Sequence, residues 1–348
     1  MKAWQLHGIN DIRLDDIAVP EVSDNEVLVR VKAAGICGSD IPRIYKTGAY
    51  HHPLIPGHEF SGLAVKTGKG AEAWQSKRVG IFPLIPCGKC IPCMNEQYEM
   101  CRNYSYMGSR RNGGFAEYVV VPANNLIELP DNVTFAEAAM LEPMAVAVHS
   151  IRKVNPQKND NIAICGLGTI GLFIAMFLRI EGMENIYVIG NKDFQKEKVC
   201  GLGIPKENYC DCKIDNVEAW INEKTNENGV DVFFECVGRN ETINQSLNNT
   251  APGGKVMLVG NPYSDMIFSK TVYWKILRNQ LMVMGTWNSS FTHRNSDDWQ
   301  YVIEKLKSGK SMAKEFISHS LKINELEKGF HIMRDKSEDY IKIMMISE

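Results

Sequence analysis

Short apolar runs separated by Gly and Pro turns dominate the first part of the chain. Runs such as "EVLVRVKAAG" and "GGFAEYVVVP" alternate apolar and polar positions with the period of a half-buried strand. Near "MLEPMAVAVHSIRKV" the spacing of the apolar positions becomes helical. The pattern therefore predicts a β-rich first domain that ends at about residue 149.

After "KNDN" the pattern changes to buried strands that alternate with helices. The runs "IAICG", "IYVIG", "DVFFECVG" and "KVMLVG" are continuously apolar, as required of parallel strands that helices cover on both faces. They predict a doubly wound α/β domain over residues 150–288. Beyond it, "NSDDWQYVIEKLKSG" predicts a helix and "YIKIMMIS" a strand, and we assign residues 289–348 back to the first domain.

Length, charge and the amino terminus narrow the class of protein. A chain of 348 residues favours two domains. A net charge of -2 argues against a protein that neutralises many phosphates. The start "MKAWQLHGINDIRL" lacks a signal-peptide pattern, and the longest apolar run, "GLFIAMFL", is far shorter than the roughly 20 residues of a membrane helix. We expect a cytoplasmic protein with neither nucleic acid nor membrane as a partner.

Four of the ten cysteines lie in the segment "CGKCIPCMNEQYEMC", within a lobe at about residues 86–102. Cys87, Cys90, Cys93 and Cys101 follow the spacing C-x2-C-x2-C-x7-C. Four thiolates typically form a closed tetrahedral zinc site with a structural role. An iron–sulfur cluster is the main alternative, but the ferredoxin run has x3 and a following Pro. Unliganded thiols are the third interpretation.

The stretch "NIAICGLGTIGLF" carries a G-x-G-x-x-G pattern between a predicted strand and a predicted helix. Its residues are Gly166, Gly168, Thr169, Ile170 and Gly171. Glycines at this spacing allow a tight turn and close approach of the backbone to a pyrophosphate, which the helix amino terminus also binds. The segment predicts dinucleotide binding.

An acidic residue usually ends the second strand of such a domain and hydrogen-bonds the adenosine ribose. In "IYVIGNKDFQK" this place is occupied by Gly190, Asn191 and Lys192. Without a carboxylate to repel a 2′-phosphate, and with a lysine beside it, the site is predicted to accept NADP(H) as well as NAD(H).

A second, dispersed set of residues has the composition of an open catalytic zinc site. "AGICGSD" supplies Cys37, "PGHEF" supplies His58 and Glu59, and "LEPMAVAVH" supplies Glu142. Glu142 precedes a proline that suits the first turn of a helix, so it should lie at a helix start. Cys, His and carboxylate ligands leave a fourth position for water or substrate. Taken singly, each of these residues also has an ordinary structural explanation.

Together these motifs resemble those of the zinc-dependent medium-chain alcohol and polyol dehydrogenases. "AGICGSD", "PGHEFSG", the four-cysteine lobe, "GGFAEY", "LEP" and "GLGTIG" occur in the order seen in that family and span nearly the whole chain. The resemblance implies a GroES-like catalytic domain over 1–149 and 289–348, a Rossmann domain over 150–288, and an active site between them. It also implies a homodimer or homotetramer.

The resemblance also implies roles for single residues. Cys37, His58 and Glu142 would bind a catalytic zinc, and Glu59 would ligate it transiently. Asp40 would orient His58, and Ser39 would take the proton of the substrate hydroxyl. Relatives often carry a histidine shortly after the Cys motif, where this chain has "IPR". The proton route beyond Ser39 therefore stays open between His51 and water.

The implied reaction is hydride transfer between a secondary hydroxyl of a polyol and NAD(P), with one catalytic and one structural zinc per chain. Segments such as "YMGSRRNGGFAEY" resemble polyol-phosphate dehydrogenases, which implies a substrate such as galactitol 1-phosphate. The cations predicted to bind the phosphate are Arg110, Arg111, Arg43 and Lys46. The alternatives are a dehydrogenase of unphosphorylated polyols or other secondary alcohols, similar to sorbitol dehydrogenase, and a non-catalytic zinc-braced dinucleotide-binding protein.

Overall fold

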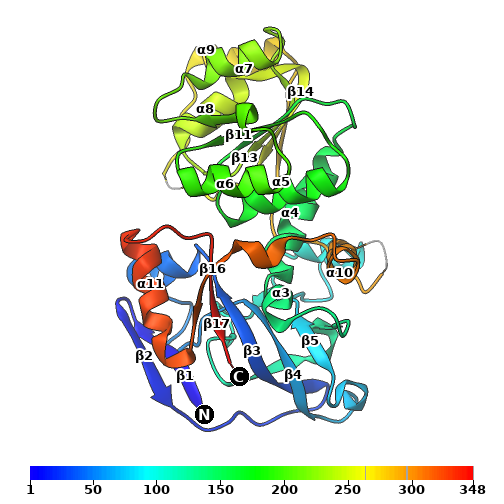
Figure 1. Cartoon of the computed structure of the whole chain (residues 1–348). Helices are drawn as coiled ribbons and strands as arrows, with labels where there is room; N and C mark the ends of the chain where they lie inside the picture. Colours follow the sequence, from blue (N-terminus) through cyan, green and yellow to red (C-terminus); the bar gives the residue numbers. More distant parts are fainter. Residues whose placement is uncertain (263, 295–296, 348) are drawn as a thin grey trace. The chain divides into compact units, whose positions relative to one another are not determined.

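The structure is a computed structural model that describes residues 1–262, 264–294 and 297–347. The chain forms two compact units, one from Met1–Pro143 and Ser289–Glu348 and the other from Met144–Asn288. The passage from the first unit to the second falls within helix α4 (Leu141–Val154). Figure 1 shows the helices and strands of both units.

The second unit is built on a six-stranded parallel sheet. Its strand order is β12-β11-β10-β13-β14-β15, in which the chain starts in the middle of the sheet, builds one half and then the other. This is the order of a Rossmann fold, as predicted. The strands are β10 (Ile162–Cys165), β11 (Ile186–Gly190), β12 (Tyr209–Asp211), β13 (Val230–Glu235), β14 (Thr250–Leu258) and β15 (Met282–Gly285).

Helices cover this sheet because its central strands are apolar on both faces. Every residue of β10 and β11 is buried, and α5 (Thr169–Ile180) buries the run from Gly171 to Leu178. The other helices of the unit are α6 (Asp193–Gly201), α7 (Val217–Lys224), α8 (Asn240–Asn248) and α9 (Lys270–Arg278). The edge strand β15 differs, because Met282, Val283 and Gly285 are exposed.

The first unit is β-rich and centres on a seven-stranded sheet. The order is β16-β17-β3-β4-β5-β9, and β8 also pairs with β3. All pairs are antiparallel except β16 with β17. The strands are β3 (Glu26–Ile36), β4 (Glu59–Thr67), β5 (Arg78–Ile81), β8 (Tyr118–Pro122), β9 (Leu126–Glu128), β16 (Ile317–Leu321) and β17 (Lys342–Ile346).

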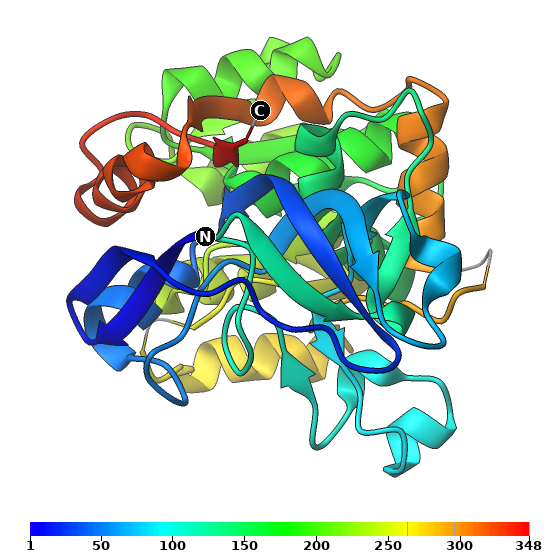
Figure 2. The same cartoon turned by 90° about the horizontal axis from the view of Figure 1, so that it is seen from below.

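Segments from both ends of the chain complete the first unit. The last strand, β17, pairs with β3, and the core joins Trp4 near the amino terminus to Phe330 on α11 (Leu326–Asp335). The ribbon of β1 (Lys2–Gly8) and β2 (Asp11–Asp16) is drawn in dark blue (Figure 2). The first unit also contains the strands β6 (Leu84–Ile85) and β7 (Ser105–Tyr106) and the helices α1 (Asp40–Pro42), α2 (Ile91–Met94), α3 (Phe135–Ala139) and α10 (Asp298–Lys307).

None of the helices in the described ranges combines the length and the apolar character that a membrane crossing requires.

Candidate metal centres and dinucleotide loop

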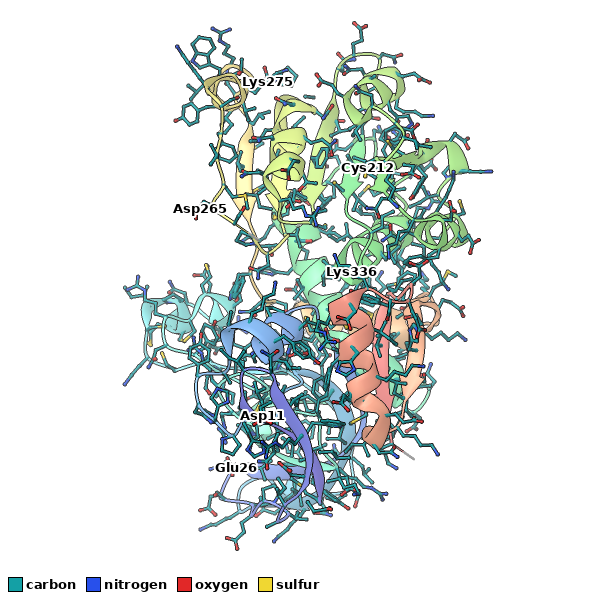
Figure 3. The ribbon with its side chains drawn as sticks, turned by 90° about the vertical axis from the view of Figure 1, so that its left-hand side faces the viewer. Asp11, Glu26, Cys212, Asp265, Lys275 and Lys336 are labelled. Atoms are coloured by element: carbon teal, nitrogen blue, oxygen red, sulfur yellow. The ribbon has the colours of Figure 1, made fainter. Side chains whose placement is uncertain are left out.

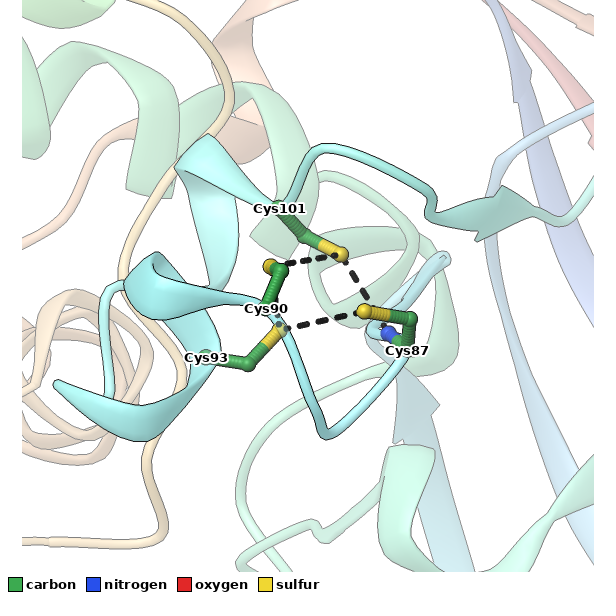
Figure 4. Close-up of side chains that lie close together, drawn as sticks. All are labelled: Cys87, Cys90, Cys93 and Cys101. Atoms are coloured by element: carbon green, nitrogen blue, oxygen red, sulfur yellow. Dashed lines mark hydrogen bonds between the residues drawn. The ribbon is translucent and has the colours of Figure 1, made fainter.

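The four clustered cysteines point their sulfur atoms at one another in the lobe of the first unit (Figure 4). Sγ of Cys90 lies 3.4 Å from Sγ of Cys93 and 3.9 Å from that of Cys101, and Sγ of Cys87 lies 3.9 Å from that of Cys93. A tetrahedron with Zn–S bonds of about 2.3 Å has S–S edges of about 3.8 Å. The spacing of the sulfurs therefore fits a closed zinc site.

Local backbone groups prepare some of these thiols for metal binding. The N–H groups of Arg102 and Cys93 lower the pKa of Cys90 to about 6, and those of Lys89 and Cys90 lower the pKa of Cys87. Burial raises the pKa of Cys93 to about 12, so a nearby divalent charge would be needed to hold that thiolate at neutral pH. The donor set supports a structural zinc site.

A second group of potential ligands lies where β3 ends and β4 begins. Cys37 follows β3, His58 precedes β4, and Glu59 is the first residue of β4. Because these strands are antiparallel and Gly35 pairs with Glu59, their adjoining ends meet. One ligand atom from each of Cys37, His58 and Glu59 lies within 4.8 Å of the others. Thiolate, imidazole and carboxylate are together a donor set suited to zinc.

Asp40 lies directly behind this group and is fully buried. Its carboxylate accepts hydrogen bonds from the N–H of Cys37 at 3.0 Å and from Nη1 of Arg43 at 2.8 Å. Nδ1 of His58 is 3.5 Å from Oδ1 of Asp40, at ion-pair distance but without hydrogen-bond geometry. Asp40 thus holds the Cys37 backbone and lies at ion-pair distance from the His58 ring, and its orienting role stays a prediction.

The electrostatic field of this centre favours positive charge. Burial lowers the pKa of His58, but Asp40 and Cys37 outweigh that effect and hold it well above its usual value. Burial likewise raises the pKa of Asp40, yet the charges of His58 and Arg43 leave it lower than usual. A site that stabilises a buried cation in this way suits a bound metal ion.

Glu59 has a partner that the sequence did not reveal. Nζ of Lys342, on β17, lies 2.5 Å from Oε2 of Glu59 and also donates to the carbonyl of Ile36 at 3.2 Å. Both side chains of the ion pair are almost fully buried. A Cβ on Gly35 would collide with the Glu59 carboxylate and press on Lys342, so the glycine of "AAGICGSD" makes room for the pair.

Glu142, predicted as the third ligand, is near enough to His58 and Glu59 to interact with them electrostatically. Among the described residues, however, it is Glu59 and not Glu142 that converges with Cys37 and His58. Glu142 lies in the first turn of α4, and Oε1 accepts a hydrogen bond from the hydroxyl of Tyr106 at 3.1 Å. Burial and the negative charge of Glu142 raise the pKa of Tyr106 well above its usual value, so this hydroxyl stays protonated and donates. The ring of Tyr106 also contacts the His58 ring, with centroids 5.8 Å apart. Tyr106 was not predicted from the sequence.

Ser39 lies next to the sulfur of the first ligand. Its hydroxyl donates to Sγ of Cys37 at 3.4 Å, and the side chain is partly accessible. The Ser39 hydroxyl therefore lies beside one of the three converging donors.

The four cations predicted to bind phosphate fall into different environments. Arg43 forms an ion pair with Asp40, and Nη2 of Arg111 lies 3.0 Å from Oε1 of Glu26. Lys46 is exposed on the irregular turn that follows α1. Arg110 is held between two aromatic rings, with its Cζ 4.6 Å from the centroid of Tyr50 and 4.4 Å from that of Tyr104.

The glycine loop of the second unit joins β10 to α5. Gly166 has φ of +94°, and a Cβ on Gly171 would lie 2.0 Å from the Gly166 carbonyl oxygen. Gly168 is the N-cap of α5, which begins at Thr169 and Ile170. Gly166 therefore allows the tight turn, and Gly171 allows the helix to pack closely against it. Gly168 leaves the amino terminus of the helix open to a ligand.

The end of β11 places Gly190, Asn191 and Lys192 ahead of α6. A Cβ on Gly190 would lie 2.8 Å from the hydroxyl of Tyr209, so a larger residue there would require that side chain to shift. That hydroxyl accepts from the N–H of Lys192 and donates to its carbonyl, each at 3.2 Å. Lys192 is the N-cap of α6 and is thereby fixed at the strand end where ribose recognition was expected.

Comparison with known proteins identifies both units. An alcohol dehydrogenase GroES-like domain matches residues 23–131 and a zinc-binding dehydrogenase domain matches residues 169–308. Galactitol 1-phosphate 5-dehydrogenase of Escherichia coli K12 is 30% identical over 88% of this chain and 89% of its own length. L-idonate 5-dehydrogenase of Vitis vinifera is 34% identical over 92% of this chain and 87% of its own.

Solved structures agree with these matches. The crystal structure of galactitol-1-phosphate dehydrogenase from Escherichia coli has a TM-score of 0.93 at 27% identity and covers 100% of both chains. A zinc-binding dehydrogenase from Sinorhizobium meliloti 1021 bound to NADP has a TM-score of 0.90 at 26% identity and covers 99% of both. The predicted GroES-like and Rossmann folds are confirmed, and the chain belongs to the family of zinc-binding alcohol and polyol dehydrogenases.

Proposed function

We propose that this dehydrogenase transfers a hydride between a secondary hydroxyl of a polyol phosphate, such as galactitol 1-phosphate, and NAD(P). The observation that carries this proposal is the convergence of Cys37, His58 and Glu59, backed by Asp40. Galactitol 1-phosphate 5-dehydrogenase of Escherichia coli K12 is among the relatives, and its name supplies the substrate class.

Each residue of the centre has a defined task in this proposal. Cys37 and His58 would hold the catalytic zinc together with a carboxylate from Glu59 or Glu142. When bound, zinc supplies the Lewis acidity that lets a hydroxyl lose its proton near neutral pH. Ser39 accepts that proton and passes it outward, while Asp40 fixes the His58 ring. Lys342 holds Glu59, and Tyr106 holds Glu142, so each carboxylate has a hydrogen-bonding partner when it is not a ligand.

Arg110 is the best placed of the four candidate cations to bind the phosphate. Nη1 donates to the carbonyl of Tyr104 at 2.7 Å, Nη2 donates to the hydroxyl of Tyr50 at 3.3 Å, and both rings contact the guanidinium. The ring of Tyr104 lies 6.1 Å from that of Tyr106, which in turn contacts His58. Successive ring contacts thus link a pre-ordered guanidinium to the metal centre, an arrangement that suits recognition of a phosphate on the same substrate.

Replacing Arg110 with alanine is expected to raise KM for a polyol phosphate about 10- to 100-fold, since hydrogen bonds to charged groups contribute about 1.5–3 kcal/mol. KM for the unphosphorylated polyol should change less than about threefold. Steady-state kinetics with both substrates measures this. Arg111→Ala is the matched control, because its guanidinium pairs with Glu26. Equal effects of Arg110→Ala on the two substrates would rule out the phosphate contact.

An unphosphorylated polyol is the second candidate substrate. It is favoured by the observation that Arg43 and Arg111 already have carboxylate partners and so add little free positive charge. A sorbitol dehydrogenase of Bacillus subtilis is 26% identical over 93% of this chain. Wild-type kcat/KM that is higher for free polyols than for their phosphates would favour this candidate.

For the cofactor, we propose that NADP(H) is accepted and that Lys192 binds its 2′-phosphate. Replacing Lys192 with alanine should raise KM for NADP(H) about tenfold and leave KM for NAD(H) within about twofold, because only the former carries that phosphate. Comparison of kcat/KM for the two cofactors in wild type and variant measures this. A strong wild-type preference for NAD(H) would refute the proposal.

We also propose that two copies associate through the edge strand β15, as a dimer or within a tetramer. Large apolar side chains are exposed on this strand (Met282, Val283) and on the preceding helix α9 (Tyr273, Trp274, Leu277), and also in the segments beside them (Ile267, Phe268, Trp287). Lys275 and Asp265 mark this face in Figure 3. An unpaired apolar edge can bond to its own copy around a two-fold axis, which satisfies its free backbone groups. A monomeric mass by light scattering would contradict this.

A further inference from the structure

A buried carboxylate lies beneath the turn that follows β13. Glu235, the last residue of that strand, is completely buried. Its Oε1 accepts hydrogen bonds from the N–H groups of Val237 and Gly238, each at 2.9 Å, and from the hydroxyl of Thr242 at 2.7 Å. Its Oε2 accepts from Gly238 as well, at 3.2 Å. The donors come from the turn itself and from the first turn of α8.

These donors make the buried charge tolerable and fix the shape of the turn. A carboxylate removed from water is costly unless it is well hydrogen-bonded, and here two amides and a hydroxyl converge on it. The amides of Val237 and Gly238 must both face inward to reach Glu235. The opposite side of the turn therefore faces away from the sheet at the carboxyl ends of the strands, which is where ligands bind in folds of this kind.

The same turn is wedged against the glycine loop. A Cβ on Gly166 would lie 2.6 Å from a methyl carbon of Val237, and the N–H of Cys236 donates to the carbonyl of Cys165 at 2.8 Å. On the other side, a Cβ on Gly238 would lie 2.1 Å from the carbonyl oxygen of Asn261. The loops that follow the adjacent strands β10, β13 and β14 are thus closely packed against one another. Glu235 is the buried group that holds the loop after β13.

We propose that Glu235 is a positioning residue for the dinucleotide: it fixes the turn at residues 236–239 against the glycine loop and so sets cofactor affinity. The inference rests on the proposed dinucleotide binding. The Glu235 carboxylate binds the backbone of the turn and the Thr242 hydroxyl, so it acts on the cofactor through the turn. Its loss should therefore weaken cofactor binding without disturbing the metal centre of the other unit.

Three variants test this: Glu235→Gln, which keeps the shape but removes the charge; Thr242→Val, which removes one donor; and Asp231→Asn. Asp231 is the matched control, because it lies at the opposite end of β13 and accepts from the N–H of Asn161 at 2.8 Å. Fluorescence titration with NADH and NADPH gives Kd, and steady-state kinetics gives KM for the polyol.

We expect Glu235→Gln to raise the cofactor Kd about tenfold and Thr242→Val to raise it about threefold. The polyol KM, the zinc content and the Kd of Asp231→Asn should stay at wild-type values. A purely structural Glu235 would lower Tm in Glu235→Gln while Kd stays unchanged, and that result overturns the inference. If Glu235→Gln fails to fold, an unchanged Kd in Thr242→Val overturns it instead. A wild-type enzyme that binds neither dinucleotide would refute the proposed function and this inference with it.

Discussion

Replacing Cys37 with serine is expected to lower kcat by about 1,000-fold or more and to release one zinc per chain. The thiolate is one of three donors within 4.8 Å of one another, and its loss leaves an imidazole and a carboxylate that Lys342 also binds. A catalytic metal ion stabilises the charge of the transition state by several kcal/mol, and losing that stabilisation lowers kcat by about 1,000-fold. Steady-state kinetics and zinc quantification by mass spectrometry measure the two effects.

Cys212→Ser is the matched control for this experiment, because Cys212 is exposed and lies in the second unit, outside both cysteine-containing groups (Figure 3). It should retain wild-type activity and zinc content. If Cys37→Ser keeps activity within about threefold and loses no zinc, the catalytic centre lies elsewhere in the chain.

Replacing Cys93 with serine should strongly destabilise the first unit. Cys93 is the buried cysteine of α2, and its sulfur lies within 3.9 Å of the sulfurs of both Cys87 and Cys90. Structural zinc contributes about 10–16 kcal/mol of apparent binding free energy in small zinc domains. Even about 5 kcal/mol would lower Tm by roughly 10–20 °C. Calorimetry together with zinc quantification measures the effect.

Cys93→Ser and Cys37→Ser are expected to lose different zinc ions. Cys93→Ser should lose the lobe zinc and keep the catalytic one, so freshly prepared protein remains partly active at low temperature. A Tm within about 2 °C of wild type, with all zinc retained, would show that the four cysteines do not form a structural site.

The sequence was informative wherever a motif is local. The glycine loop, the apolar strands of the second unit and the four-cysteine spacing each lie within a short segment, so their periodicity and spacing could be read directly. The parallel direction of the strands followed from the βαβ pattern, because parallel neighbours require crossover connections, whereas their order in the sheet came from the structure. Cys37 and His58 were grouped by their ligand chemistry and by the family resemblance, and the structure shows that their motifs adjoin neighbouring strands.

The missed residues depend on long-range pairing. Lys342 reaches Glu59 only because β17 pairs with β3 across more than 300 residues of sequence. A signal was present, since a single lysine interrupts the apolar run "YIKIMMIS", and a cation in a buried strand requires a partner. Tyr106 gave no such signal. Arg110 and Arg111 are adjacent in sequence, so the sequence could not tell their environments apart. The structure does, because Arg110 donates to the Tyr104 carbonyl and Arg111 pairs with Glu26.

Side chains from separate motifs of the first unit are proposed to gather around one catalytic metal ion. Anomalous diffraction from crystals at the zinc absorption edge tests this proposal most directly. We predict two peaks per chain, one among Cys87, Cys90, Cys93 and Cys101, and one bonded to Cys37, His58 and either Glu59 or Glu142. A single peak in the lobe, with no scatterer near Cys37 and His58 in zinc-replete, active enzyme, would contradict the account.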